Sequence, residues 1–347
     1  MSSPSIIMGT GGFGVTWSKD DLGALARALK EAGIDPIDTA ALYPVGASGL
    51  SEKLVGEGKF GEHGFQIDSK ILFSGDGSGN LTAPKIQESL SKTFDSLKVA
   101  SVSLLQNHFN IDIETYQKFG GQLNVLYCHG PDKTTPIAEQ AAAFDAEYRN
   151  GKFQRLGVCN LSPEMLKEWL FVATEKGYVK PSVFQGQYNL LSRTYESTLF
   201  PLLREHGISF VAFSPLAGGF LTGKLTFSSG AEDLKATRFE VSDTNFMGMG
   251  YRHWYDKPSM HAAVQKMEGL CKENGVSLTA AAWRWILYHS PLEAGHGDAV
   301  IVGPRNLEQL QSYDEIAKQG PLTDDLAQAL NDLWEGVAQD AAGIVVY

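Results

Sequence analysis

The chain has 347 residues, 43% of them hydrophobic, so it can bury a core large enough for one barrel of about 250 residues with insertions. Its formal net charge of −11 argues against nucleic acid or an anionic membrane as the main partner. No stretch reaches the roughly 18 apolar residues of a membrane span, no signal peptide precedes the first apolar run, and three cysteines lack metal-ligand spacing, which together predict a cytoplasmic protein with reduced thiols.

Short apolar runs alternate with amphipathic helical patterns along the whole chain. Strands are expected at Ile6–Met8, Ile37–Asp38, Gln66–Lys70, Val125–Cys128, Leu156–Cys159, Val183–Gln187, Ile208–Phe213 and Ala299–Val302. Helices are expected at 20–32, 51–57, 82–97, 136–149, 163–176, 196–206, 259–274, 278–289, 306–318 and 322–337. This alternation, with right-handed crossovers, predicts an α/β fold. The predicted fold is a parallel eight-stranded (β/α)₈ TIM barrel that spans residues 1–347 as a single domain, with extra C-terminal helices.

Four polar residues fall at or just beyond the ends of predicted strands: Asp38, Tyr43, Lys70 and His129. In such a barrel the active site lies at the carboxyl ends of the strands, so these side chains are expected to meet. A tyrosine hydroxyl with a pKa of about 10 becomes a better acid beside an ammonium group, which a carboxylate keeps charged. An imidazole can bind the substrate oxygen and share in proton transfer. The set is suited to carbonyl reduction, for which a nicotinamide cofactor must supply the hydride.

The longest expected loop, about residues 214–257, is rich in glycine and aromatic residues. Because a loop of this length is rarely a mere connection, we expect a cofactor clamp or lid. Two aromatic residues of this loop, Trp254 and Tyr255, together with Trp17 after the first strand, are candidates to line the substrate pocket beside His129. Core packing is at least as common a role for such rings.

Two motifs suggest a different fold. Gly9-Thr-Gly11-Gly-Phe-Gly14 matches the dinucleotide fingerprint of Rossmann dehydrogenases, but the following helix is expected to begin only at Ser18, as its N-cap. Tyr148 and Lys152 match the spacing of the short-chain dehydrogenase pair, but Asn150-Gly151 between them is a helix-ending signal. A Rossmann-type dehydrogenase is therefore the less favoured alternative.

The chain resembles the aldo-keto reductase superfamily, and most closely its aflatoxin-aldehyde reductase branch, from about Ile6 to Trp334. The segments that carry the resemblance are Asp38-Thr-Ala and Tyr43, Tyr127-Cys-His-Gly-Pro-Asp132, Gly151-Lys-Phe-Gln-Arg-Leu-Gly157, Gln185-Gly-Gln-Tyr-Asn189, Ser214-Pro-Leu-Ala-Gly-Gly with Gly223-Lys224, and His296-Gly-Asp-Ala-Val300. Each segment alone is weak evidence for the family, whereas the whole series in this order is specific to it.

This resemblance implies that Tyr43 donates the proton, Lys70 lowers its pKa, Asp38 holds the lysine and His129 orients the carbonyl. It also implies that NADPH or NADP⁺ binds across the barrel mouth. Asn160 and Gln185 would hold the carboxamide. The loop 214–224 would hold the pyrophosphate through Ser214, Pro215, Leu216, Gly218, Gly219 and Lys224. The adenosine end with its 2′-phosphate would lie at Arg238, Gly303, Arg305 and Gln309, since guanidinium groups suit a phosphate.

The chain departs from the family pattern at three places. Cys159 stands where a serine is usual, and Tyr313 where an adenine-binding asparagine is common. About twenty residues, Val102–Gln122, are added between a helix and the next strand, on the barrel face opposite the expected active site. This segment is either a genuine insertion or a retained intron, because Val-Ser and Gln can be encoded by the typical edges of an intron. Transcript reads that span it without a junction would exclude the second explanation.

The sequence therefore predicts an NADP-dependent reductase of a small-molecule aldehyde or ketone, which forms a monomer or homodimer and binds neither nucleic acid nor membrane. The alternative from another class is a regulatory subunit of the same fold that binds the cofactor with little turnover. The complete four-residue set favours the enzyme.

Overall fold

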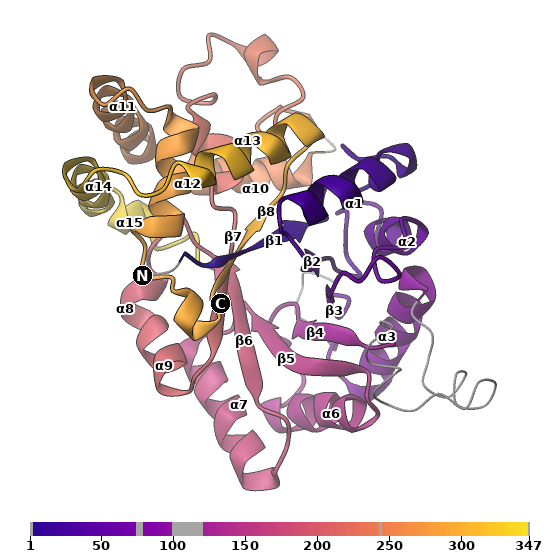
Figure 1. Cartoon of the computed structure of the whole chain (residues 1–347). Coiled ribbons are helices and arrows are strands. Elements are labelled where there is room, and N and C mark those ends of the chain that lie inside the picture. The colour runs from indigo at the N-terminus through magenta and orange to yellow at the C-terminus, as the bar shows by residue number, and fades with distance from the viewer. Residues whose placement is uncertain (1–2, 74–78, 99–120, 243–244, 346–347) are drawn as a thin grey trace.

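The structure is a computed structural model, and it describes residues 3–73, 79–98, 121–242 and 245–345. Eight parallel strands follow one another in chain order and close into a barrel, which confirms the predicted fold (Figure 1). The strands are β1 (Ser5–Gly9), β2 (Ile37–Asp38), β3 (Ile67–Lys70), β4 (Leu123–Cys128), β5 (Phe153–Cys159), β6 (Pro181–Gln187), β7 (Ser209–Phe213) and β8 (Ala299–Val302). The barrel closes through the pairing of β1 with β8, in which Ile7 lies beside Ile301.

Helices surround the strands on the outside (Figure 1). They are α1 (Leu22–Glu31), α2 (Leu50–Glu57), α3 (Ala83–Leu97), α6 (Ile137–Arg149), α7 (Pro163–Lys176), α8 (Tyr195–Thr198), α9 (Phe200–Glu205), α10 (Phe246–Tyr255), α11 (Pro258–Glu273), α12 (Leu278–Tyr288), α13 (Leu307–Lys318), α14 (Asp324–Asn331) and α15 (Ala338–Ala341). Short 3₁₀ turns are η1 (Lys19–Asp21), η2 (Ala217–Thr222), η3 (Ala231–Leu234), η4 (Ala294–His296) and η5 (Asp332–Gly336). Within the described ranges, no helix is long and apolar enough to cross a membrane.

Local sequence signals set several helix boundaries. Helix α7 begins after Ser162, whose hydroxyl accepts the Met165 N–H at 3.2 Å, and has Pro163 in its first turn. It ends at Gly177, which adopts the left-handed conformation with φ 65°. The Rossmann alternative is wrong, because the chain turns between Phe13 and Trp17 before η1 begins.

Several expected elements differ from the structure. The helix expected at 322–337 is the shorter α14, followed by the 3₁₀ turn η5. The helix expected at 196–206 is split into α8 and α9 at Leu199, next to Pro201, which has no N–H to donate. The long loop 214–257 contains the helix α10, which begins at Asn245, whose side chain accepts the Gly248 N–H at 2.9 Å. The expected insertion 102–122 lies between α3 and β4, and all but its last two residues fall outside the described ranges.

The barrel interior is packed rather than hollow. A cluster of inward side chains fills it: Ile7, Val125, Tyr127, Cys159, Val183, Val211, Ala299 and Ile301. The Tyr127 ring lies against the backbone of Gly157 on the neighbouring strand, where an added Cβ would come within 2.2 Å of the ring. A larger hydrophobic core fills the space between the barrel and the helices.

We expect Gly157→Ala to destabilise the protein by about 1–3 kcal/mol, because overpacking forces the ring or the strand to move. Urea unfolding measures this change. Gly295→Ala is the matched control, since nothing lies within 4 Å of a Cβ added there. Equal stability of the two variants would contradict the close contact.

Candidate active site

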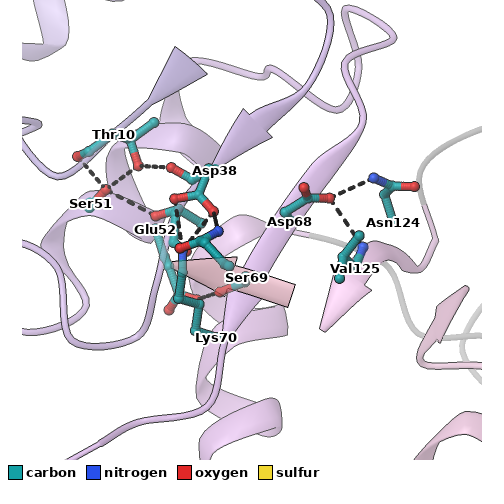
Figure 2. Close-up of polar contacts among 11 residues, drawn as sticks. Thr10, Asp38, Ser51, Glu52, Asp68, Ser69, Lys70, Asn124 and Val125 are labelled. Atoms are coloured by element: carbon teal, nitrogen blue, oxygen red, sulfur yellow. Dashed lines mark hydrogen bonds and ion pairs between the residues drawn. The ribbon is translucent and has the colours of Figure 1, made fainter. Parts of the chain in front are cut away.

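The four strand-end residues come together at the carboxyl ends of β2, β3 and β4. Asp38 ends β2, Lys70 ends β3, Tyr43 lies in the loop after β2, and His129 directly follows β4. The Lys70 Nζ lies 2.6 Å from Asp38 Oδ1 and 5.1 Å from the centroid of the Tyr43 ring (Figure 2 shows the ion pair). The Tyr43 and His129 rings meet edge to face with their centroids 5.5 Å apart.

The ion pair of Lys70 and Asp38 is shielded from solvent. The ammonium donates to both carboxylate oxygens, at 2.6 and 2.7 Å, and to the Thr39 carbonyl at 2.8 Å. Burial alone would lower the pKa of Lys70, but Asp38 and Tyr43 hold it above its ordinary value. Lys70 is therefore a fixed positive charge beside the phenol ring.

Burial keeps the hydroxyl of Tyr43 and the imidazole of His129 neutral. It raises the pKa of Tyr43 to about 12, although the Lys70 ammonium acts to lower it. Burial, together with the Lys70 charge, lowers the pKa of His129 to about 3. At neutral pH the site therefore contains a protonated phenol, the form that a proton donor needs, beside an uncharged imidazole.

A polar network behind the pair was not anticipated from the sequence. The Ser51 hydroxyl, at the start of α2, donates to the Thr10 carbonyl at 2.9 Å and bonds the Thr39 hydroxyl at 3.0 Å (Figure 2). Its backbone N–H donates to the Tyr43 carbonyl at 3.1 Å. Glu52 beside it accepts from the Ser69 hydroxyl at 2.6 Å. No signal in the sequence indicated this network, because the burial of Ser51 and Glu52 is evident only once α2 is packed against the strands.

A second unanticipated feature is the carboxylate of Asp132, which joins two loops at the barrel mouth. It accepts from backbone N–H groups of Gly79, Leu81, Thr134 and Thr135 at 3.0–3.2 Å, and from both threonine hydroxyls at 2.8 Å. Burial alone would raise the pKa of Asp132, but these hydrogen bonds hold it well below its usual range. Gly79 and Leu81, just before α3, are thereby held against the loop that carries His129.

The residues expected to hold the carboxamide also lie at the strand ends. Asn160, with φ 56°, follows β5 and donates from Nδ2 to the His129 carbonyl at 3.3 Å. Gln185 on β6 donates from Nε2 to Asp38 Oδ1 at 2.9 Å. Within the described part of the chain, the buried Nδ1 atom of His129 has no hydrogen-bond partner.

The loop after β7 presents glycine-rich backbone next to positive charge. Gly218 and Gly219 have φ 67° and 102°, and a Cβ at Gly218 would meet the Tyr251 ring at 2.3 Å. The Arg238 guanidinium lies 4.8 Å from the centroid of the same ring. Among the other predicted cofactor residues, Lys224, Gly303 and Arg305 are exposed, Gln309 and Ser214 are half-buried, and Pro215 and Leu216 are buried. Exposed cations beside glycines with positive φ angles fit a group that carries phosphates.

The aromatic residues predicted for the substrate pocket differ in exposure. The indole of Trp17 is buried and donates to the Pro304 carbonyl at 2.7 Å. Tyr255 is also buried, and its hydroxyl accepts from the side chains of Gln187 and Asn189 at 2.7 and 2.9 Å. Trp254 is half-buried against the Tyr251 ring, with the centroids 5.3 Å apart. Trp17 and Tyr255 thus connect loops around the mouth.

One further aromatic residue, Phe73, was missed. It is half-buried, and its ring centroid lies 6.3 Å from that of His129. Its position as an apolar residue three places after Lys70, beyond the end of a strand, was an available signal.

Two of the residues that depart from the family pattern are part of the packed interior. Cys159 lies inside the barrel, and the Tyr313 ring packs against Trp283 with the centroids 5.8 Å apart.

The tyrosine and lysine of the short-chain dehydrogenase spacing do not form a site. Helix α6 ends at Arg149, and Gly151 has φ 70°. The Tyr148 ring packs against Phe153, whereas Lys152 lies over Phe94.

Lys70→Met is expected to destabilise the protein by about 3–5 kcal/mol, because it leaves Asp38 as a buried anion without its partner. The double variant Asp38→Asn/Lys70→Met should lose less than the sum of the two single variants, since neither charge is then left alone. Urea unfolding of all four proteins measures the coupling. Strictly additive losses would mean that the pair contributes no coupling energy.

The profile of the Aldo/keto reductase family matches residues 5–119 and 113–335 of the chain. The chain is 34% identical to oxidoreductase sirO of Leptosphaeria maculans over 98% of its own length and 96% of that protein. It is 33% identical to an aldo-keto reductase of Pseudocercospora fijiensis over 90% and 97% of the two chains. To aflatoxin B1 aldehyde reductase member 2 of Rattus norvegicus it is 31% identical over 97% and 86%. With this extent of similarity and the barrel-mouth geometry above, the chain belongs to the aldo/keto reductase family and is an NAD(P)H-dependent oxidoreductase.

Proposed function

We propose that this protein reduces an aldehyde or ketone to an alcohol, with NADPH as the reductant and Tyr43 as the proton donor. The observation that carries the proposal is the buried ion pair of Lys70 and Asp38 beside the ring of Tyr43, which the His129 ring also meets edge to face. An ion pair with a purely structural role would not explain why the rings of Tyr43 and His129 lie in contact beside it.

The bound nicotinamide supplies the hydride that adds to the carbonyl carbon. The Tyr43 hydroxyl gives its proton to the carbonyl oxygen, so that hydride and proton together complete the alcohol. The Lys70 ammonium stabilises the phenolate that remains, and Asp38 keeps this ammonium charged and oriented. The neutral imidazole of His129 binds the carbonyl oxygen and directs it toward Tyr43.

The proposed cofactor residues divide according to the part of NADPH that they suit. Asn160 and Gln185 carry amide oxygens that can accept from a carboxamide, and the Gln185 Nε2 is already engaged with Asp38. The backbone of the loop 214–224 suits the pyrophosphate, since its glycines adopt positive φ angles and Arg238 lies beside them. Arg238 and Arg305 suit a 2′-phosphate. The side-chain oxygen of Gln309 accepts from the backbone N–H of Arg305 at 2.9 Å.

For the substrate we propose a carbonyl compound with an aromatic or otherwise apolar body, such as an aryl aldehyde or a dialdehyde. Support comes from the half-buried rings of Trp254 and Phe73, and from the name of the aflatoxin B1 aldehyde reductase to which the chain is similar. Trp17 and Tyr255 are buried, so their part in the pocket would be to hold its loops in place. We further propose a cytoplasmic monomer or homodimer, in keeping with three buried cysteines that form no disulfide.

Tyr43→Phe is expected to lower kcat for para-nitrobenzaldehyde by about 10²–10⁴-fold, because the variant loses the general acid. The decrease in NADPH absorbance measures turnover, and NADPH fluorescence shows that the variant still binds the cofactor. Tyr148→Phe on α6 is the matched control. A parent protein that binds NADPH but turns over no carbonyl compound would favour the regulatory subunit instead.

Arg305→Gln is expected to weaken NADPH binding by about 10–100-fold while NADH binding changes little, because the guanidinium would contact only the 2′-phosphate. Fluorescence titration with both cofactors measures the ratio. Lys176→Gln is the control, since Lys176 is an exposed cation at the C-terminal end of α7, on the barrel face where the strands begin. An equal loss of affinity for NADPH and NADH would show that Arg305 does not bind the 2′-phosphate.

A further inference from the structure

A second buried carboxylate lies inside the barrel below the reaction centre. Asp68 is on β3 two residues before Lys70, so both side chains face the same side of the strand. It is 2% exposed, and its Cα is paired with that of Asp38 across β2 and β3. Figure 2 shows Asp68 on the strand that carries Lys70, directed toward β4.

Among the described residues, the hydrogen bonds of Asp68 come from neutral donors and not from a cation. Asn124 Nδ2 and the Val125 N–H both donate to one oxygen, Oδ1, at 2.6 and 3.1 Å. Both donors are neutral groups, so they orient the carboxyl group without balancing a charge. The ammonium of Lys70 is already bonded to Asp38 and to the Thr39 carbonyl.

A count of charges makes an ionised Asp68 unfavourable. Asp38 and Lys70 cancel, so a second carboxylate would leave one unpaired negative charge in a closed, apolar interior. The other ionisable groups that face Asp68 are Tyr127 on β4 and Arg155 on β5. Tyr127 is a buried phenol, while Arg155 is exposed and bonds the Asn124 amide oxygen at 3.3 Å, so water screens its charge. Burial, followed by the charge of Asp38, raises the pKa of Asp68 to about 7.

We propose that Asp68 is a positioning residue that sets the electric field on Tyr43: as a neutral acid it leaves the Lys70 ammonium balanced by Asp38 alone, and as an anion it weakens the stabilisation of the Tyr43 phenolate. This role rests on the reductase function proposed above. An ionised Asp68 makes proton donation by Tyr43 harder, because its charge on the strand of Lys70 offsets part of the ammonium charge that stabilises the phenolate. The reduction rate therefore falls as Asp68 loses its proton.

The pH range in which Asp68 titrates contains no titration of the two groups at the reaction centre. Burial raises the pKa of Tyr43 to about 12 and lowers that of His129 to about 3. Between about pH 6 and about pH 9 neither of these side chains changes its protonation, so a change in kcat near pH 7 reports on Asp68.

Protonation of Asp68 can be tested without catalysis, by thermal unfolding of the parent and of Asp68→Asn as a function of pH. The folded-state pKa of about 7 exceeds the ordinary aspartate value of 3.8, so the folded state binds more protons between these values and the parent loses stability as pH rises through this range. Asparagine stays neutral and can keep the hydrogen bonds to Oδ1. The thermal unfolding midpoint of Asp68→Asn should therefore rise relative to that of the parent as pH increases. A difference between the two midpoints that does not change with pH would overturn the proposal.

The link to the reaction is tested by kcat profiles at saturating NADPH. We expect kcat of the parent to fall as pH rises through about 7, and kcat of Asp68→Asn to stay level over that range. Asp298→Asn is the control, since Asp298 is another buried barrel carboxylate but pairs with Arg204, and it should keep the profile of the parent. A fall at the same pH in Asp68→Asn overturns the role of Asp68. A parent without activity overturns the reductase function instead, and the unfolding comparison still decides whether Asp68 carries a proton.

Discussion

The buried ion pair of Lys70 and Asp38 is the interaction on which the rest of this site depends. Removing two charges from water costs several kcal/mol per ion, and only close geometry with further hydrogen bonds offsets that cost. Here the geometry is supplied by the parallel pairing of β2 with β3, the Thr39 carbonyl and the side chain of Gln185. Any displacement of these strand ends would leave a charge without its partner, so the pair and the register of the barrel require each other.

The packed interior below the pair gives it a second property. Because aliphatic side chains and the Tyr127 ring exclude water there, the Lys70 charge is poorly screened and acts strongly on the nearby phenol. The same exclusion of water keeps both Tyr43 and His129 uncharged. One physical cause, burial, thus separates the pKa values of the two groups by many units and leaves each in the form that its proposed role needs.

The order of strands and the four strand-end residues could be predicted because both depend on local patterns: alternation of apolar runs and the position of a polar residue after each run. Other features depend on contacts between distant segments, which no local pattern contains. Helix α10 was missed since its sequence holds two glycines, and it is stabilised by the Tyr255 hydroxyl bound to β6 and the following loop. The roles of Ser51 and Asp132 likewise appear only when α2 and the loops are placed in space.

The hydrogen bonds of Asp132 have a consequence for how substrate selectivity can change. They fasten Gly79 and Leu81, at the end of the loop before α3, to the loop that follows His129, so these two segments at the barrel mouth are fixed to each other. Selectivity on this side then depends on the size and shape of individual side chains such as Phe73, rather than on the loop backbone. An enzyme built in this way can acquire a new substrate by single substitutions on this side of the mouth, while the barrel and its ion pair stay as they are.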